Sequence, residues 1–568
     1  MTSELTIDDD TDPGVATRSR DLGTPATTIA VRTDREIGRI DPKIYGHFLE
    51  SNFFGNIAGG LFDEDSPRAR SGPGVRAGLR QDVIDVCREL GLPIVRWPGG
   101  NFTSPYHWED GIGPRDARPR RMELTWSGEE DNRFGTDEFL AWCAEVGTEP
   151  YLVHSCRDVE EAVRWVEYTN HGGDTHHTRL RAANGHPEPY GVRYWGVGNE
   201  CYGPWQMGYR TAEEYAAAAR EHAMFMRLVD PGLQLVGVGI PWHQEQWTKP
   251  LIETAGQFFD YVSLHLYGAS THLYTAGDGD DDYEQVVAQS LYFAERIEEY
   301  AVMVAEMAGA AGVDRQLSLA IDEWNVRHLE PKVWPDSAPG DDGGLAPRDT
   351  PPAPVTGRGD LRVNRWSPRT LTDALCYAGI FSAMHRLSGL AVAPRMANTV
   401  NLVNASAPLV VRPDGVVRSA TYHVWDLYQN HMGPVAVSAD VDTPSRTGEV
   451  RQGDREGPGG FQTRLRTVPY LDVSATLSAD RGSLRLAVIN RHRTDHITAR
   501  LRLDGSDAAL PPTAAVRDIG ADVADVLASN SLRAPDRVSL VDRGDQPLPD
   551  GRYTFPPHSV TLLTIGIR

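Results

Sequence analysis

The sequence predicts a (β/α)8 barrel, which is a closed ring of eight parallel strands surrounded by helices, followed by a C-terminal all-β sandwich. Short apolar runs alternate with amphipathic stretches over about 350 residues. After about residue 410 the helical spacing fades and strand-like alternation replaces it. Two glutamates, Glu200 and Glu323, end apolar runs that are far apart in the chain. Functional groups of barrel proteins occupy such positions, at the carboxyl ends of the strands.

The chain begins with two segments that precede the barrel. Residues 1–24 are polar and acidic, and we expect them to be disordered. In residues 25–43, the alternation of Ile29 and Val31 predicts strands. We expect these strands to join the C-terminal sandwich, so that the two ends of the chain share one accessory domain.

The barrel is predicted over residues 44–410. Its strands are predicted at 45–50, 93–98, 150–155, 192–199, 233–239, 261–267, 317–323 and, with the least regular pattern, 389–396. Its helices are predicted at 80–90, 136–146, 158–169, 211–229, 246–259, 283–308 and 369–387. A doubly wound open sheet is the alternative. That fold places a glycine-rich phosphate turn after an early strand, and this chain has none, so the barrel is favoured.

Two further segments complete the chain. Residues 330–363 are rich in Pro, Gly and Asp and predict a long loop, which is either a lid over the substrate or a plain excursion. Residues 411–568 are predicted to form the sandwich, because alternating runs at 471–477, 484–490 and 560–565 are separated by turn residues.

Composition narrows the class of partner. The chain has 56 basic and 79 acidic residues, a net charge of −23, which argues against nucleic acid or an anionic membrane as a partner. A neutral substrate fits this charge, although a solvated acidic surface explains it equally well. The five cysteines lack metal-ligand spacing, and residues 1–24 lack the apolar region of a secretory signal. We therefore expect a cytoplasmic protein whose cysteines are buried thiols rather than zinc ligands.

Glu200 and Glu323 predict glycoside hydrolysis. A retaining glycosidase uses one carboxyl group as acid/base and a second as nucleophile. Asn199 beside Glu200 could bind a sugar hydroxyl, Trp324 beside Glu323 could stack on a sugar face, and the Tyr267 hydroxyl could donate to the nucleophile. Taken singly, each of these residues has a structural explanation, such as a salt bridge, a turn cap or core packing. Their combination at separate strand ends favours a catalytic site.

The chain resembles the α-L-arabinofuranosidases of glycoside hydrolase family 51. The motifs that carry the resemblance are Tyr45-Gly46-His47-Phe48-Leu49-Glu50, Arg96-Trp97-Pro98-Gly99-Gly100-Asn101, Tyr106-His107-Trp108-Glu109-Asp110, Asn132-Arg133-Phe134-Gly135-Thr136-Asp137-Glu138-Phe139, Gly198-Asn199-Glu200, His265-Leu266-Tyr267, Asp322-Glu323-Trp324-Asn325-Val326 and Asn401-Leu402-Val403-Asn404. Gly-Asn-Glu alone is common among barrel glycosidases, whereas the ordered set is specific to this family.

The resemblance implies a role for each matching residue. Glu200 is expected to be the acid/base and Glu323 the nucleophile of a retaining, exo-acting hydrolysis of terminal arabinofuranosyl groups from arabinan- or arabinoxylan-type oligosaccharides. The substrate-binding set it implies is Glu50, Arg96, Asn101, Asn199, His265, Tyr267, Trp324 and Asn401. Within this set, Arg96 is expected to brace the nucleophile, and His265 and Tyr267 to orient the carboxylates. The resemblance also implies a reaction that uses no metal and no organic cofactor, and a homo-oligomer, a hexamer or a trimer.

Some positions depart from the family pattern. Ser51 follows Glu50, His154 ends the third strand, Asn401 stands where the family has glutamine, and Arg327 follows the nucleophile motif. We expect these positions to line the sugar pocket or its rim, so other substrates stay open: a D-arabinofuranoside, a galactofuranoside or a β-glucan. A carbohydrate-binding protein without activity is the alternative outside the enzymes. The retention of both Glu200 and Glu323 argues against it.

Overall fold

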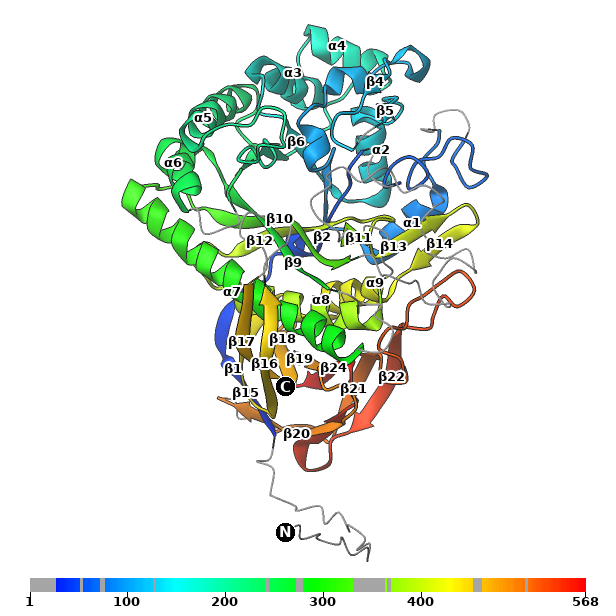
Figure 1. Cartoon of the computed structure of the whole chain (residues 1–568), viewed down its shortest axis with the longest axis vertical. Coiled ribbons are helices and arrows are strands. Elements are labelled where there is room, and N and C mark those ends of the chain that lie inside the picture. Colours follow the sequence, from blue (N-terminus) through cyan, green and yellow to red (C-terminus); the bar gives the residue numbers. More distant parts are fainter. Residues whose placement is uncertain are drawn as a thin grey trace, which may run out of the picture.

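The barrel closes as a ring of eight parallel strands (Figure 1). The computed structural model describes residues 27–51, 55–71, 77–126, 128–240, 245–271, 279–329, 363–364, 369–452, 462–505 and 509–567. The barrel strands are β2 (Gly46–Phe48), β3 (Ile94–Trp97), β6 (Glu149–His154), β7 (Tyr194–Val197), β8 (Gln234–Gly237), β9 (Tyr261–Thr271), β10 (Ser318–Leu329) and β12 (Pro394–Val400). Each strand pairs with the next in this order, and β12 pairs with β2 to close the ring. The predicted fold class is confirmed.

Helices follow the strands and cover the outside of the ring. They are α1 (Gln81–Leu90), α2 (Thr136–Val146), α3 (Val159–Asn170), α4 (His176–Ala183), α5 (Ala212–Val229), α6 (Glu245–Ala255), α7 (Gly279–Ala311), α8 (Leu371–Arg386) and α9 (Ala420–Trp425). Local capping fixes several of their ends. The Asp158 side chain accepts from two backbone N–H groups at the start of α3, and Gly91 ends α1 in a left-handed conformation. The sequence analysis did not predict the short, polar α4.

Strands β9 and β10 are longer than predicted. They continue past the barrel rim as a ribbon, in which Asn325 pairs with Tyr267 and His328 with Thr271. The short strand β11 (Val363–Asn364) adds to the end of this ribbon. Because each strand satisfies the other's backbone groups, the pair extends beyond its apolar run. The predicted loop at 330–363 lies outside the described residues except at its last position.

The C-terminal domain is built on a nine-stranded sheet, in the order β22-β21-β24-β19-β18-β15-β1-β20-β23. Its strands are β1 (Thr28–Arg39), β15 (Val435–Asp442), β18 (Leu471–Leu477), β19 (Ser483–Asn490), β20 (Ile497–Asp504), β21 (Thr513–Ile519), β22 (Leu540–Pro547), β23 (Arg552–Phe555) and β24 (Ser559–Gly566). As predicted, the N-terminal strand β1 belongs to this domain, where it pairs with β15 and β20. Residues 1–24, predicted to be disordered, lie outside the described residues.

Three hairpins complete the described secondary structure. They are β4 (Arg121–Met122) with β5 (Glu129–Glu130), β13 (Leu409–Arg412) with β14 (Gly415–Arg418), and β16 (Ser445–Gln452) with β17 (Gln462–Pro469). The β13–β14 hairpin spans the domain boundary predicted at residues 410 and 411, and the limits of the two domains stay predictions.

Helix α8 joins the two domains. Every residue from Leu371 to His385 is buried, because the helix lies between α7 of the barrel and strand β18 of the β domain (Figure 1). The largest apolar cluster therefore runs continuously from the barrel helices to α8, while a second cluster fills the β domain. All five cysteines are buried free thiols. None of the described helices has a stretch apolar and long enough to cross a membrane.

Candidate active site

The two glutamates meet at the carboxyl end of the barrel. Glu200 lies in the loop just beyond the carboxyl end of β7, and Glu323 lies within β10. One side-chain oxygen of each and a ring nitrogen of His265 lie within 4.8 Å of one another. Parallel strands in a closed ring bring their carboxyl ends to the same rim, which is why residues so distant in sequence become neighbours.

A β-bulge in β10 turns two consecutive acids toward the barrel interior. Relative to β9, the register shifts by one residue between Ala320 and Glu323, and relative to β12 it shifts between Ile321 and Trp324. A regular strand would point Asp322 and Glu323 to opposite faces. The extra residue breaks this alternation, so both carboxyl groups face inward while Trp324 faces outward.

Three donors surround the carboxylate of Glu323. Arg96 Nη1 donates to Oε1 at 2.8 Å, and the Tyr267 hydroxyl donates to Oε2 at 2.8 Å. The Nδ1 atom of His265 lies 3.4 Å from the same Oε2. Glu323 is only 6% exposed, so these charge-assisted contacts replace the water that a carboxylate would otherwise bind.

Glu200 is held by His265 and by the loop that follows it. Its Oε1 lies 2.9 Å from His265 Nδ1, and its Oε2 accepts from Trp205 Nε1 at 3.1 Å. The Tyr202 hydroxyl donates to Oε1 at 3.2 Å. Burial alone would raise the pKa of Glu200, but His265 and Trp205 outweigh it, and the pKa is lowered. The backbone of Glu200 has a φ of 43°, a conformation that costs a non-glycine residue about 1 kcal/mol or more.

Glu50 is a third buried carboxyl group in the site. It follows β2, is 2% exposed, and its Oε1 accepts from the backbone N–H of Phe102 at 2.8 Å. Burial is the largest influence and raises the pKa of Glu50 to about 8, with a contribution from the negative charge of Glu323. At neutral pH, Glu50 can therefore both donate and accept hydrogen bonds.

Amide side chains connect the strand ends. Arg96 Nη2 donates to the Asn199 side-chain oxygen at 2.6 Å, and Asn199 Nδ2 lies 3.5 Å from the Asn101 side-chain oxygen. Gln206 also donates to that Asn101 oxygen. The sequence analysis did not identify Tyr202, Trp205 or Gln206. Their position directly after Gly198-Asn199-Glu200 was the available signal, since loops that follow barrel strands line the active site.

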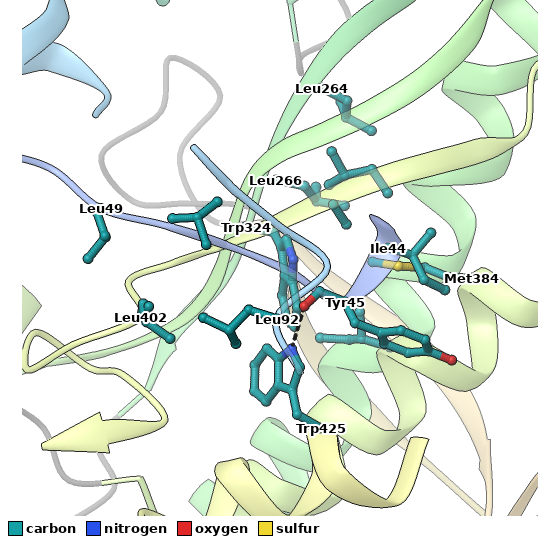
Figure 2. Packing of buried hydrophobic residues seen from close by; sticks show 14 of the residues in the cluster. Ile44, Tyr45, Leu49, Leu92, Leu264, Leu266, Trp324, Met384, Leu402 and Trp425 are labelled. Atoms are coloured by element: carbon teal, nitrogen blue, oxygen red, sulfur yellow. Dashed lines mark hydrogen bonds between the residues drawn. The ribbon is translucent and has the colours of Figure 1, made fainter. Parts of the chain in front are cut away.

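The prediction for Trp324 needs a correction. Its ring is fully buried and packs against Trp425, Phe381 and Tyr377, on the side of the barrel that faces helices α8 and α9 (Figure 2). It cannot stack on a sugar at the carboxyl end of the barrel. The reason is the bulge in β10, after which Trp324 falls on the outward phase of the strand.

Two of the departures from the family pattern also face away from the barrel interior. His154 stacks on His222 of α5 with ring centroids 5.2 Å apart, and the Ser51 hydroxyl accepts from Trp97 Nε1 at 3.0 Å. Trp97 itself stacks on Phe139 of the helix layer. The expectation that Ser51 and His154 line the sugar pocket or its rim was therefore wrong. His154 falls on the outward phase of β6, and the Ser51 side chain, beyond the end of β2, contacts the outward-facing Trp97.

Asn401 ends β12 and is 1% exposed. Its Nδ2 donates to the backbone oxygen of Ala405 at 3.2 Å, and its side-chain oxygen has no partner among the described residues. Arg327, beyond the nucleophile motif, lies over the Tyr267 ring at 3.7 Å from the centroid. The role of Asn401 in binding sugar stays a prediction.

Profiles of two domains match the chain. The profile described as "Alpha-L-arabinofuranosidase 1 domain" matches residues 86–285, and "Alpha-L-arabinofuranosidase C-terminal domain" matches residues 322–559. The first covers the middle of the barrel, and the second runs from β10 to the last strand of the β domain.

Curated relatives and solved structures match over nearly the whole chain. Alpha-L-arabinofuranosidase C of Emericella nidulans is 34% identical over 95% of this chain and 97% of its own. The intracellular exo-alpha-(1->5)-L-arabinofuranosidase of Streptomyces lividans is 31% identical over 91% of this chain and 72% of its own. The crystal structure of the alpha-L-arabinofuranosidase of Thermotoga maritima in complex with arabinose has a TM-score of 0.78 at 31% identity, covering 95% of this chain and all of that one. With the closed barrel, the β domain that includes β1 and these full-length matches, the chain belongs to the α-L-arabinofuranosidases of glycoside hydrolase family 51.

Proposed function

We propose that Glu200 and Glu323 hydrolyse terminal α-L-arabinofuranosyl groups with retention of configuration. The observation that carries this proposal is the close approach of the two carboxyl groups, whose nearest oxygens lie within 4.8 Å of one another. Retaining glycosidases have carboxyl groups about 5–5.5 Å apart, whereas inverting enzymes need about 6.5–9.5 Å to admit a water molecule between carboxylate and sugar.

The reaction has two steps. In the first, the Glu323 carboxylate attacks the anomeric carbon, the protonated form of Glu200 gives its proton to the leaving oxygen, and the bond between sugar and leaving group breaks. Because His265 and Trp205 outweigh burial and lower the pKa of Glu200 in the free site, this protonated form is the minor one until a bound sugar favours it. In the second, Glu200 takes a proton from a water molecule whose oxygen attacks the same carbon, and the ester bond to Glu323 breaks. Arabinose is released with its original configuration, and both carboxyl groups return to their starting protonation states.

The surrounding residues divide into two groups in this mechanism. Arg96, Tyr267 and His265 contact the carboxylates at 2.8–3.4 Å and orient them. Glu50, Asn101 and Asn199 bind the furanose hydroxyls. The buried Glu50 suits this task because a protonated carboxyl group pairs with a hydroxyl both as donor and as acceptor.

The division of roles is tested with two variants and two substrates. Glu323→Gln should abolish turnover while arabinose binding stays measurable. Glu200→Ala should slow arabino-oligosaccharides far more than 4-nitrophenyl arabinofuranoside, whose leaving group needs little protonation, and azide should restore part of the rate by forming arabinofuranosyl azide. NMR of the first product formed by the wild type should show retention. An inverted product, or equal losses on both substrates, contradicts the assignment.

Exo action and preference for arabinan- or arabinoxylan-type oligosaccharides belong to the same proposal. They are supported by the family and by the exo activity in the name of the Streptomyces lividans relative. Chromatography of the products from linear arabino-oligosaccharides should show arabinose released from the first minutes. A panel of nitrophenyl furanosides and pyranosides tests the sugar, and turnover of only a pyranoside or a glucan contradicts it.

We also propose that the protein is a cytoplasmic homo-oligomer. The expectation of a hexamer or trimer rests on the family resemblance, and the expectation for the compartment is consistent with the name of the relative described as intracellular. Light scattering during size-exclusion chromatography gives the mass of the assembly directly. Fractionation of the source cells, with activity followed in each fraction, tests the compartment.

A further inference from the structure

A fourth buried carboxyl group, Asp322, lies beneath the catalytic pair. It immediately precedes Glu323 and is 2% exposed. The β-bulge that turns Asp322 inward places it one layer deeper in the barrel than Glu323. A buried charge is costly unless it is paired, so its surroundings show what keeps it there.

Four groups from three other strands contact Asp322. The Tyr151 hydroxyl of β6 donates to Oδ2 at 2.8 Å, and the Ser263 hydroxyl of β9 donates to Oδ1 at 2.5 Å. His265 Nε2 lies 3.4 Å from Oδ1, and Arg96 Nε lies 3.6 Å from Oδ2. Asp322 thus contacts Arg96 and His265, the two cationic side chains that also contact the catalytic carboxylates. It contacts each cation through a different nitrogen atom from the one that faces those carboxylates.

Each of these cations bridges two levels of the site. His265 faces Asp322 with Nε2 and approaches Glu200 and Glu323 with Nδ1. Arg96 faces Asp322 with Nε and donates to Glu323 with Nη1. A side chain held at both ends cannot rotate without breaking a charged contact. Asp322 therefore restricts the positions of Glu200 and Glu323 through the two cations.

The charge states agree with this arrangement. Burial alone would raise the pKa of Asp322, but Arg96, His265 and Ser263 lower it to about 2. Burial alone would lower the pKa of His265, but the charges of Glu323, Asp322 and Glu200 raise it to about 10. At neutral pH, Asp322 is therefore an anion and His265 a cation.

We propose that Asp322 is a positioning residue, which holds His265 and Arg96 from below and so fixes the geometry of Glu200 and Glu323 without touching the sugar. The proposal rests on the function proposed above. It predicts an effect on kcat rather than on KM, because misplaced reacting groups slow the chemical step while the sugar-binding residues stay in place.

Other ionisable groups face this cluster from the surrounding elements. They are Glu50 after β2, Glu200 and Tyr202 after β7, Tyr267 of β9, Tyr300 of α7 and Arg327 of β10. None of these residues is replaced in a variant of Asp322, although the Asp322 charge contributes to the raised pKa of Tyr300. A change of pH dependence in a variant of Asp322 therefore reports on its direct partners.

The test replaces Asp322 by asparagine, which has nearly the same shape but no charge. Asp322→Asn should reduce kcat on 4-nitrophenyl arabinofuranoside about 10- to 100-fold with KM nearly unchanged. It should also move the alkaline limb of the kcat profile to lower pH. The sign follows because His265 loses a counter-ion, so its pKa falls and it loses its proton earlier as the pH rises.

Asp472→Asn is the matched control, since Asp472 is also a buried aspartate that pairs with arginines, Arg386 and Arg491, but lies in the β domain. It should lower stability and leave the pH profile at the wild-type position. A wild-type kcat and pH profile in Asp322→Asn, or a loss of stability alone, overturns the inference. If Glu323→Gln is inactive and Glu200→Ala is slow on arabino-oligosaccharides in the same series, a negative result for Asp322→Asn concerns the role of Asp322 and not the proposed function.

A second variant covers the case in which Asp322→Asn does not fold. Ser263→Ala removes the hydroxyl that holds Oδ1 and leaves every charge in place. Its kcat should fall about three-fold or more with KM unchanged, because Asp322 is then less firmly placed. A wild-type kcat in a folded Ser263→Ala variant also overturns the inference.

Discussion

Buried carboxyl groups are compensated differently in two regions of the molecule. Where α8 meets the β domain, Asp472 accepts from Arg386 Nη1 at 2.7 Å and from Arg491. These two cations serve one carboxylate, and they lower its pKa. At the carboxyl end of the barrel, the carboxyl groups of Glu200, Asp322 and Glu323 contact two cations, Arg96 and His265, and a fourth carboxyl group, that of Glu50, lies close to them.

The difference separates a structural use of buried charge from the catalytic use that we propose for the site. A carboxylate with its cations in place stabilises the contact between two domains and has no tendency to gain a proton. The site instead holds more acid than base, so the protonation of at least one group is finely balanced, as the raised pKa of Glu50 shows. This excess lowers stability, and the closed barrel and its large apolar core offset the cost.

Removal of the nucleophile should have the largest effect. Glu323→Gln keeps the size of the side chain and removes its charge, so kcat on 4-nitrophenyl arabinofuranoside should fall by about 1,000-fold or more. Thermal unfolding should show a melting temperature no lower than that of the wild type, because the site has more acidic groups than cations and the variant removes one of the acidic groups. A rate within ten-fold of the wild type would remove Glu323 as the nucleophile.

Replacement of Asp472, the carboxylate between the two domains, should lower stability and leave activity unchanged. Asp472→Asn leaves Arg386 and the buried Arg491 without their counter-ion, so the free energy of unfolding should fall by about 2–4 kcal/mol. Activity measured well below the melting temperature should equal that of the wild type. Denaturant unfolding measures the first quantity and initial rates the second, and a loss of kcat without a loss of stability contradicts the comparison.

Glu50 should lower the stability of the protein at alkaline pH, because it is a buried carboxyl group that lacks a cation of its own. Its pKa is about 8 in the folded protein, whereas the ordinary pKa of a glutamate side chain is 4.5. Between these pH values the folded state retains a proton that the unfolded state releases, so wild-type stability falls as the pH rises. Glu50→Gln should therefore melt about 2–6 °C higher than the wild type at pH 8 and at nearly the same temperature at pH 5.

The same variant should lose activity, because Glu50 is proposed to bind a sugar hydroxyl. We expect a lower kcat/KM together with higher stability at alkaline pH. Calorimetry across the pH range measures the difference in melting temperature between Glu50→Gln and the wild type. Asp472→Asn is the control, and its difference from the wild type should not shrink toward pH 5. If Glu50→Gln and the wild type had equal melting temperatures at both pH 5 and pH 8, the Glu50 carboxyl would be ionised in the folded protein.

Trp324 should show the smallest effect and no effect on the sugar. Trp324→Phe removes part of a buried ring and should lower the free energy of unfolding by about 1–2 kcal/mol. The indole N–H has no partner among the described residues, so its loss leaves no acceptor unpaired. KM should equal the wild-type value. A ten-fold higher KM with unchanged stability would restore the stacking role that the sequence suggested.

The elements that could be read from the sequence are those with strong local signals. Helix α2 was predicted at residues 136–146 and is Thr136–Val146, and α5 was predicted at 211–229 and is Ala212–Val229. Both combine helical spacing with a capping signal. Thr211 and Glu214 form a capping box at the start of α5, and at the start of α2 Glu138 accepts from the backbone N–H of Gly135. These signals act within a few residues. The short α4 has a polar sequence and lacks that spacing, so its stability depends on contacts with α3.

The identity of the site residues was also within reach of the sequence. Glu200 and Glu323 stand at the ends of apolar runs, and the alternation of strands and helices implies a barrel in which such ends converge. Their contacts with Arg96, His265 and Tyr267 were expected from the family pattern. The loop contacts of Trp205 and Gln206 were not, since the path of an irregular loop has no periodic signal.

The direction in which side chains point depended on the assembled barrel. The composition and period of residues 317–323 determine that a buried strand forms there, because alternation and apolar content are properties of the local chain. Whether Asp322 faces inward with Glu323, and whether Trp324 faces sugar or core, depends on the bulge in β10. That bulge exists only in the pairing of β10 with β9 and β12, which are distant in sequence and become neighbours when the ring closes.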